Sequence, residues 1–221
     1  MTGWLTPAEL TLFAQAFATT LAISAAGILL AVFLAMPLAV ALRSRSAFLR
    51  CPARLYTEFM RGAPLVILLF LLYYGGPSVG LLLPATTIGV VGLGFYGAAY
   101  FAEIFRAGLG SVPWGEVEAA RLLGLSRSQC FLSIEAPQAA RLCIAPATGQ
   151  VIALVKESAV LSIITISELT KVAGEISNMS FAVVTPYLTA ALLYWALVEL
   201  VARLGLRAER ALRTTESRTH A

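Results

Sequence analysis

The chain has 221 residues, of which 59% are hydrophobic and only 13% are charged, and its mean hydropathy is +0.83. Soluble globular domains carry about 25% charged residues, so this chain has too few polar side chains to cover a surface in water. The composition excludes an ordinary soluble domain and predicts a protein largely surrounded by lipid.

Long uncharged stretches divide the chain into membrane spans. Uncharged runs cover 10–42, 62–102 and 176–198, and an apolar stretch at 142–166 is interrupted only by Lys156-Glu157. One helix needs roughly 20 apolar residues to cross the hydrocarbon, so the second run holds two spans, separated by a turn at 75–84. We predict a single all-α polytopic membrane domain, 1–221, whose five transmembrane helices cover 10–42, 56–75, 84–108, 138–160 and 182–204.

The two ends of the chain and the first connection have their own signals. Thr6, Pro7 and Glu9 suit an N-cap, a first helical position and an acidic first turn. The first cation is Arg43, which disfavours a cleaved signal peptide because such peptides begin with a basic segment. We expect a basic linker at 43–54 and a frayed tail from Arg207 onward.

The cations lie on one side of the predicted membrane domain. Fourteen of the sixteen Lys and Arg fall in the connections 43–61 and 106–141 and in the segment 203–218, and only Lys156 and Lys171 fall elsewhere. The positive-inside rule then predicts an outer N-terminus and a cytoplasmic C-terminus. The net charge of +4 is a topology signal, because no basic patch with interleaved aromatic residues indicates nucleic-acid binding.

Metal binding and disulfides are not expected. Cys51, Cys130 and Cys143 fit no zinc spacing and map to the cytoplasmic side, and His220, in the tail, is the one histidine. We interpret the cysteines as reduced thiols.

The segment between the third and fourth spans predicts two short surface helices. Residues 116–123 suit an amphipathic helix, Gly124 ends it, and Ser126 suits the cap of a second helix. On periodicity alone, an ordinary interfacial loop is an equal alternative.

Four blocks in this region carry a family resemblance. Glu118-Ala119-Ala120, Gly124, Ile134 and Pro137 fit the pattern E-A-A-x3-G-x9-I-x-x-P, with Ala136 where leucine often precedes the proline. The other blocks are 58–65, 97–106 and 137–139. Together they resemble the permease subunits of bacterial ABC importers, in the branch that takes up polar amino acids.

The resemblance implies a function and a set of partners. A coupling loop at 115–130, with Glu118, Ala119, Ala120 and Gly124, would dock on a separate ATP-binding cassette ATPase dimer, which holds ATP and magnesium. The chain has no G-x-x-x-x-G-K-[ST] motif, so we do not expect it to be an enzyme or to bind a cofactor. A second copy or a homologous permease chain and a periplasmic substrate-binding protein would complete an importer in the bacterial inner membrane, which works by alternating access.

Polar residues within the spans are candidates for the solute pathway. Ionisable residues near the bilayer centre cost roughly 2.5–3.5 kcal/mol each on insertion scales, so they usually face protein or a wet cavity. Glu157 and Gln150, two turns apart, would share one stripe of the fourth span. Ser158 and Tyr100 are further candidates, although a structural role for Glu157 remains open. The family commonly has Lys-Asp-Thr/Ser-Ser where this chain has Lys156-Glu157-Ser158-Ala159.

Two pairs at i, i+3 spacing are interpreted as structural. Glu58 with Arg61, and Glu103 with Arg106, are spaced to neutralise each other on a helix surface.

Alternative functions remain. The chain could serve an ABC importer for another solute class, or it could be a secondary transporter, although repeated halves are not evident. The sequence leaves open the identity of the amino acid or opine, whether the dimer has identical chains, and which chain holds the solute.

Overall fold

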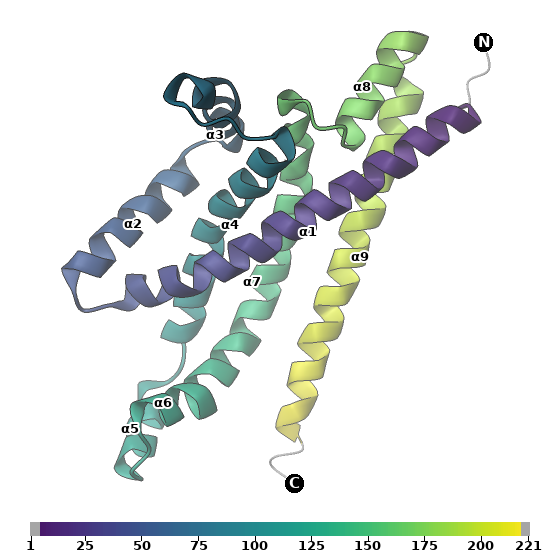
Figure 1. Cartoon of the computed structure of the whole chain (residues 1–221). Helices are drawn as coiled ribbons and strands as arrows, with labels where there is room; N and C mark the ends of the chain where they lie inside the picture. The colour runs from purple at the N-terminus through teal and green to yellow at the C-terminus, as the bar shows by residue number, and fades with distance from the viewer. Residues whose placement is uncertain (1–4, 218–221) are drawn as a thin grey trace.

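The computed structural model describes residues 5–217, which are almost entirely helical (Figure 1). The α-helices are α1 (Pro7–Arg43), α2 (Ala47–Gly62), α3 (Leu65–Phe70), α4 (Ala85–Gly110), α5 (Trp114–Leu122), α6 (Arg127–Cys130), α7 (Ala136–Glu157), α8 (Leu169–Ser180) and α9 (Val184–Ser217). Two π-helical segments, η1 (Leu71–Gly75) and η3 (Phe131–Glu135), and two 3-10 segments, η2 (Gly76–Val79) and η4 (Ser158–Ile164), join or extend them. Arg218 and His220 lie outside the described residues.

The all-α membrane fold is confirmed. Four helical stretches are long and apolar enough to cross a membrane: Pro7–Arg43, Ala85–Gly110, Arg127–Ile164 and Val184–Leu212. A fifth span is possible if the bent pair Ala47–Gly62 and Leu65–Val79 is counted as one. The start of α1 is also as predicted, because Thr6 and Glu9 form a reciprocal capping box and Pro7 opens the helix.

The second span differs from the prediction. A helix begins at Ala47, inside the expected linker, and the chain bends by 103° between α2 and the segment that starts at Leu65. Pro64 explains the break, because it lacks an N–H and disfavours helical geometry at Ala63, which has a ψ of 136°.

Three further elements differ from the expectations. Helix α8 was not predicted, and α9 continues regularly to Ser217 instead of fraying after Arg207. Lys156-Glu157 does not lie in mid-helix but ends α7, after which the backbone tightens into η4.

Helix α4 lies at the centre of the bundle. Its glycines face three other helices: a Cβ at Gly94 would meet Leu30 of α1, and one at Gly92 would meet Leu69 of α3. A Cβ at Gly97 would lie 2.7 Å from Leu154 of α7. The small residues of this span therefore let the neighbouring helices approach closely.

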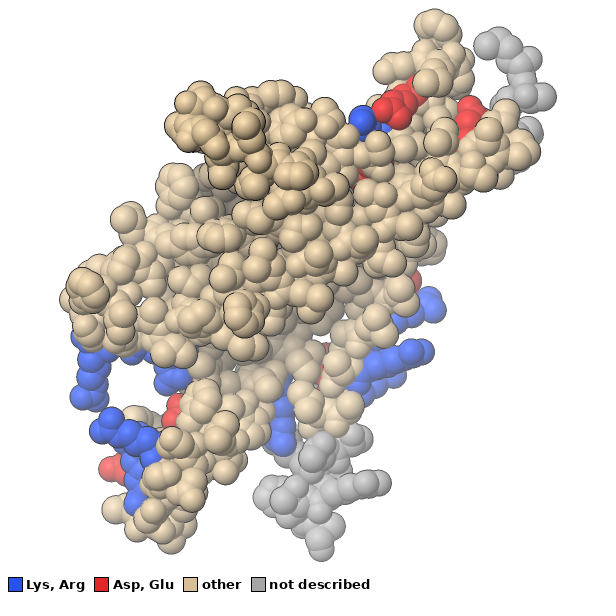
Figure 2. All heavy atoms as spheres, viewed as in Figure 1, with Lys and Arg blue, Asp and Glu red and all other residues tan. Residues whose placement is uncertain are grey.

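The two ends of the bundle differ in charge. Figure 2 shows Lys and Arg gathered at the end that carries the α1–α2 turn, the α5–α6 segment and the C-terminal half of α9. We call this the arginine-rich end, and the end with α8 and the η1–η2 turn the opposite end.

Candidate functional site

The α5–α6 segment folds around a small core of its own. Val117, Ala120 and Cys130 are buried there. Gly124 ends α5 with a φ of +88°, a conformation that favours glycine, and Ser126 and Gln129 form a capping box for α6. The predicted short helix that ends at a glycine is present, but the second helix is not short, because α6 continues through η3 into α7 and Arg127–Ile164 is one helical stretch.

The exposed face of this segment is unexpectedly apolar. Trp114, Leu122 and Leu123 are 63%, 84% and 82% exposed, and sequence reasoning did not select them. Glu118 and Ala119 are exposed beside them, whereas Ala120 is only 5% exposed. The structure therefore separates the two alanines, and Ala120 supports the segment from within.

Two polar contacts join this segment to the spans. The Gln138 amide, in the first turn of α7, donates a hydrogen bond to the Glu116 carboxylate of α5. Arg43, the last residue of α1, lies 3.6 Å from Glu135 in η3. The segment is therefore tied to two long helices.

A hollow of about 540 Å³ lies between the end of α2, the last three turns of α4 and the middle of α7. Its lining residues are Arg61, Tyr100, Glu103, Ile104, Ala107, Gly108, Ser111, Leu142, Pro146 and Gln150. The volume falls within the range of about 300–1,000 Å³ that is typical of small-molecule sites. The lining includes a cation, an anion and an amide.

A row of polar groups runs from the hollow toward the opposite end. The Arg61 guanidinium carbon lies 5.6 Å from the centre of the Tyr100 ring, and the Tyr100 hydroxyl lies 3.1 Å from that of Tyr96. These contacts connect α2 and α4.

The predicted pathway residues are placed differently from one another. Gln150 and Tyr100 line the hollow, whereas half-buried Glu157, the last residue of α7, is not among its lining residues. Ser158 is fully buried and its hydroxyl donates to the Val155 carbonyl oxygen, so it does not face the hollow.

Of the two i, i+3 pairs, one forms. Arg106 contacts Glu103 at 2.8 Å as predicted. The predicted pair of Glu58 with Arg61 is wrong, because Glu58 pairs with Arg54 at 2.7 Å. Arg61 instead lines the hollow.

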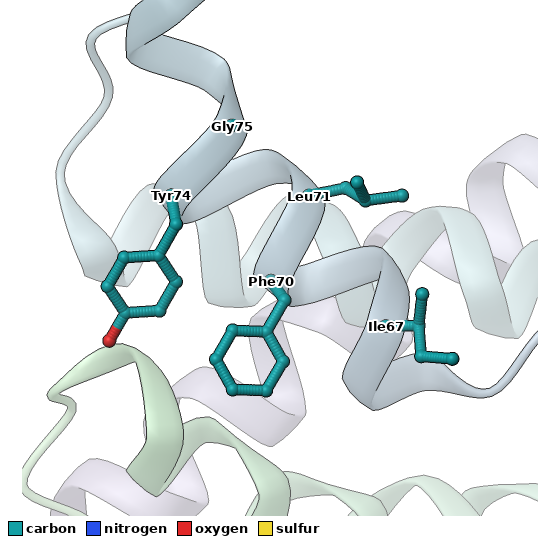
Figure 3. Close-up of a pocket in the computed structure, with 5 residues that line it drawn as sticks. All are labelled: Ile67, Phe70, Leu71, Tyr74 and Gly75. Carbon is teal, nitrogen blue, oxygen red and sulfur yellow. The ribbon is translucent and has the colours of Figure 1, made fainter.

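A second, apolar groove lies on α3 and η1 (Figure 3). Ile67, Phe70, Leu71, Tyr74 and Gly75 line it. The Tyr74 hydroxyl points toward η4, where it donates to the Ile163 carbonyl oxygen at 3.0 Å. The groove offers few polar partners to a charged solute.

Glu168 forms a buried polar centre at the opposite end. Its carboxylate accepts from the backbone N–H groups of Thr170 and Lys171 and from the Tyr194 hydroxyl of α9 at 2.6 Å. The N–H of Leu169 donates to the Thr20 hydroxyl of α1. Glu168 thus caps α8 and joins it to α9, and the neighbouring Leu169 joins the same helix to α1. Neither role was revealed by the sequence.

The comparisons with known proteins agree with this geometry. Residues 27–214 match the family model described as "Binding-protein-dependent transport system inner membrane component". The chain is 38% identical over 183 residues to the probable amino-acid ABC transporter permease protein YckA of Bacillus subtilis (strain 168), which covers 83% of this chain and 81% of that protein. It is 37% identical to the octopine transport system permease protein OccM of Rhizobium radiobacter, with 81% and 77% of the two chains covered.

A solved structure of an amino-acid transporter is also similar to this chain. The crystal structure of an amino acid ABC transporter with histidines has a chain that superposes with a TM-score of 0.85 at 31% identity, covering 91% of this chain and 94% of that one.

The fold, the projecting two-helix segment and the polar hollow define a helical membrane transport domain. The chain belongs to the family of binding-protein-dependent transport system inner membrane components, the permease subunits of ABC transporters, which are not themselves enzymes.

The Glu168 centre predicts a pH-dependent contribution to stability. Burial raises the pKa of Glu168 above its usual value of 4.5, although its hydrogen bonds oppose the shift. Because the folded protein then holds this proton more tightly, the group stabilises the fold fully below pH 4.5 and loses that contribution as pH rises through the raised pKa. The ammonium of nearby Lys171 donates to the Thr165 carbonyl oxygen and lies 3.5 Å from the Glu175 carboxylate.

Melting temperatures of wild type and Glu168→Gln in nanodiscs, measured from pH 4 to 8, test this prediction. The advantage of the wild type is expected to be largest at acid pH and to shrink toward neutrality. An advantage that grows with pH would contradict it. Glu118→Gln, which replaces an exposed acid in α5, is the control and should show little pH dependence relative to wild type.

Proposed function

We propose that the chain is the permease subunit of an ATP-driven importer that moves a polar amino acid, or a related opine-like solute, across the bacterial inner membrane. The hollow carries the proposal, because Arg61, Glu103 and Gln150 offer it charges of both signs and an amide, as a zwitterion requires. The relatives named for amino-acid and octopine transport support the same solute class.

In this proposal the α5–α6 segment is the coupling element. Its exposed Trp114, Leu122 and Leu123 would fill a cleft of the ATPase partner, which binds ATP and magnesium, since exposed apolar patches of this kind mark protein contacts. Glu118 would add a charge-assisted contact at the edge. Gly124 would fix the angle between the two helices.

The solute would pass along the tyrosines of α4. It would move from Glu157 past Tyr96 and Tyr100 into the hollow, in a cycle of alternating access biased by the ATPase. A second permease chain, identical or homologous, would cover the apolar groove of α3, and a periplasmic binding protein would deliver solute at the opposite end.

The arginine-rich end is proposed to face the cytoplasm, because cytoplasmic connections carry an excess of Lys and Arg. The N-terminus would then be periplasmic. Fusions after Thr170 are expected to show alkaline phosphatase activity, which needs the periplasm. Fusions after Arg127 are expected to show the fluorescence of a cytoplasmic reporter protein. The opposite pattern would reverse the topology.

Leu123→Asp is expected to separate the permease from its ATPase. A charge at this 82% exposed position would have to be desolvated in the contact, which costs several kcal/mol when unpaired. Copurification of the ATPase and ATP-driven uptake should both fall by about tenfold or more. Leu82→Asp, 78% exposed at the opposite end, is the matched control and should keep the ATPase. If the ATPase copurifies normally with Leu123→Asp, the proposed contact between the α5 end and the ATPase is contradicted.

Uptake by the reconstituted importer tests the solute class. Proteoliposomes with the permease, ATPase and binding protein should accumulate labelled polar L-amino acids when ATP is supplied. Gln150→Glu adds an anion to the hollow and should raise the ratio of arginine to glutamine uptake severalfold, whereas the neutral control Gln150→Asn should not. Failure of the wild type to take up any amino acid would refute the function, and an unchanged ratio would refute the role of Gln150.

A further inference from the structure

Three polar groups that line the hollow lack polar partners for their functional atoms among the described residues. The Arg61 guanidinium makes no ion pair and contacts only the Tyr100 ring. Glu103 uses one oxygen, Oε2, for both contacts with Arg106, which leaves Oε1 open. The side-chain amide of Gln150 makes no hydrogen bond within the same part of the chain.

The environment of Arg61 differs from that of Arg54 on the same helix. Arg54 is held by Glu58 at 2.7 Å, so that pair satisfies itself on the surface. Arg61 is instead positioned by its neighbours, because its guanidinium lies over Tyr100 while the Tyr100 hydroxyl donates to the Arg61 backbone carbonyl at 3.4 Å. An exposed guanidinium that is unpaired among the described residues is suited to bind a carboxylate with two parallel hydrogen bonds.

We propose that Arg61 and Glu103 form a binding station for the main-chain charges of the solute, at the arginine-rich end of the pathway. Arg61 receives the α-carboxylate, and Oε1 of Glu103 receives the α-ammonium. Gln150, on α7, contacts the side chain of the solute. This inference rests on the proposed function and assigns solute contacts to two residues that the sequence indicated to be structural.

The arrangement separates general from selective recognition. Every α-amino acid carries the two main-chain charges, so a station built on them accepts many members of the class. Selection among side chains is then left to Gln150 within the hollow and to groups nearer Glu157. Arg106 contributes by holding the Glu103 carboxylate in place through Oε2.

Ligand analogues test each charge separately. The permease–ATPase complex in nanodiscs, without binding protein or nucleotide, is titrated with labelled L-glutamine, L-arginine and L-glutamate. The tightest of these is then competed with its α-carboxamide, which lacks the carboxylate charge, and with its N-acetyl derivative, which lacks the ammonium charge. The wild type should prefer the parent amino acid to both by about tenfold or more, as expected for the loss of a charge-assisted hydrogen bond.

The variants should remove these preferences one at a time. Arg61→Gln should bind the parent and its α-carboxamide about equally while still discriminating against the N-acetyl derivative, and Glu103→Gln should do the reverse. Arg54→Gln, the control on the same helix, should behave as wild type. If Arg61 and Glu103 are purely structural, each variant should weaken the binding of the parent amino acid, its α-carboxamide and its N-acetyl derivative by the same factor. That result would overturn the proposal.

Measurements on the wild type alone can also refute the proposed binding station. If it binds the α-carboxamide and N-acetyl derivatives as tightly as the parent, the station is refuted whatever the variants do. If it still takes up amino acids in the ATP-driven assay, the proposed function survives that result. If no amino acid is bound or taken up, both the station and the solute class fail.

Discussion

The bundle depends on how closely other helices can approach α4. Gly92, Gly94 and Gly97 let leucines of α3, α1 and α7 contact the α4 backbone, at distances that a Cβ would not permit. In lipid, where apolar burial between helices gains little, such close packing is a main source of association. The three glycines contact helices on different sides of α4, and Tyr100 and Glu103 line the hollow further along the same helix. One helix therefore contributes both to the packed core and to the polar hollow.

The architecture was largely predictable because lipid imposes strong rules on sequence. Uncharged runs, the capping residues Thr6 and Glu9, and Gly124 each act locally, so their effects follow from their neighbours in the chain. The break at Pro64 also has a local cause, but the surrounding apolar run concealed it. Helix α8 was missed because its cap is an ordinary glutamate, whose partner Tyr194 comes from another span.

The site was less predictable, because it is made by three helices that meet. Spacing suggested that Arg61 would pair with Glu58, but a better partner one turn before Glu58, Arg54, takes that carboxylate. Only the assembled structure brings the released Arg61 to the same hollow as Glu103 and Gln150. Periodicity correctly places Gln150 on one face of its helix, but it carries no information about which side chains lie across from that face.

The α5–α6 segment and the hollow are both in contact with α7, so one helix connects them. Gln138, Leu142, Pro146 and Gln150 follow one another at four-residue intervals, so they form one stripe of this helix. The first residue of the stripe binds Glu116 of α5, and the other three line the hollow. Pro146 removes one backbone hydrogen bond between them and so provides a place for the helix to bend. A displacement of α5 must therefore either carry the stripe with it or bend α7 at Pro146, and both movements change the shape of the hollow.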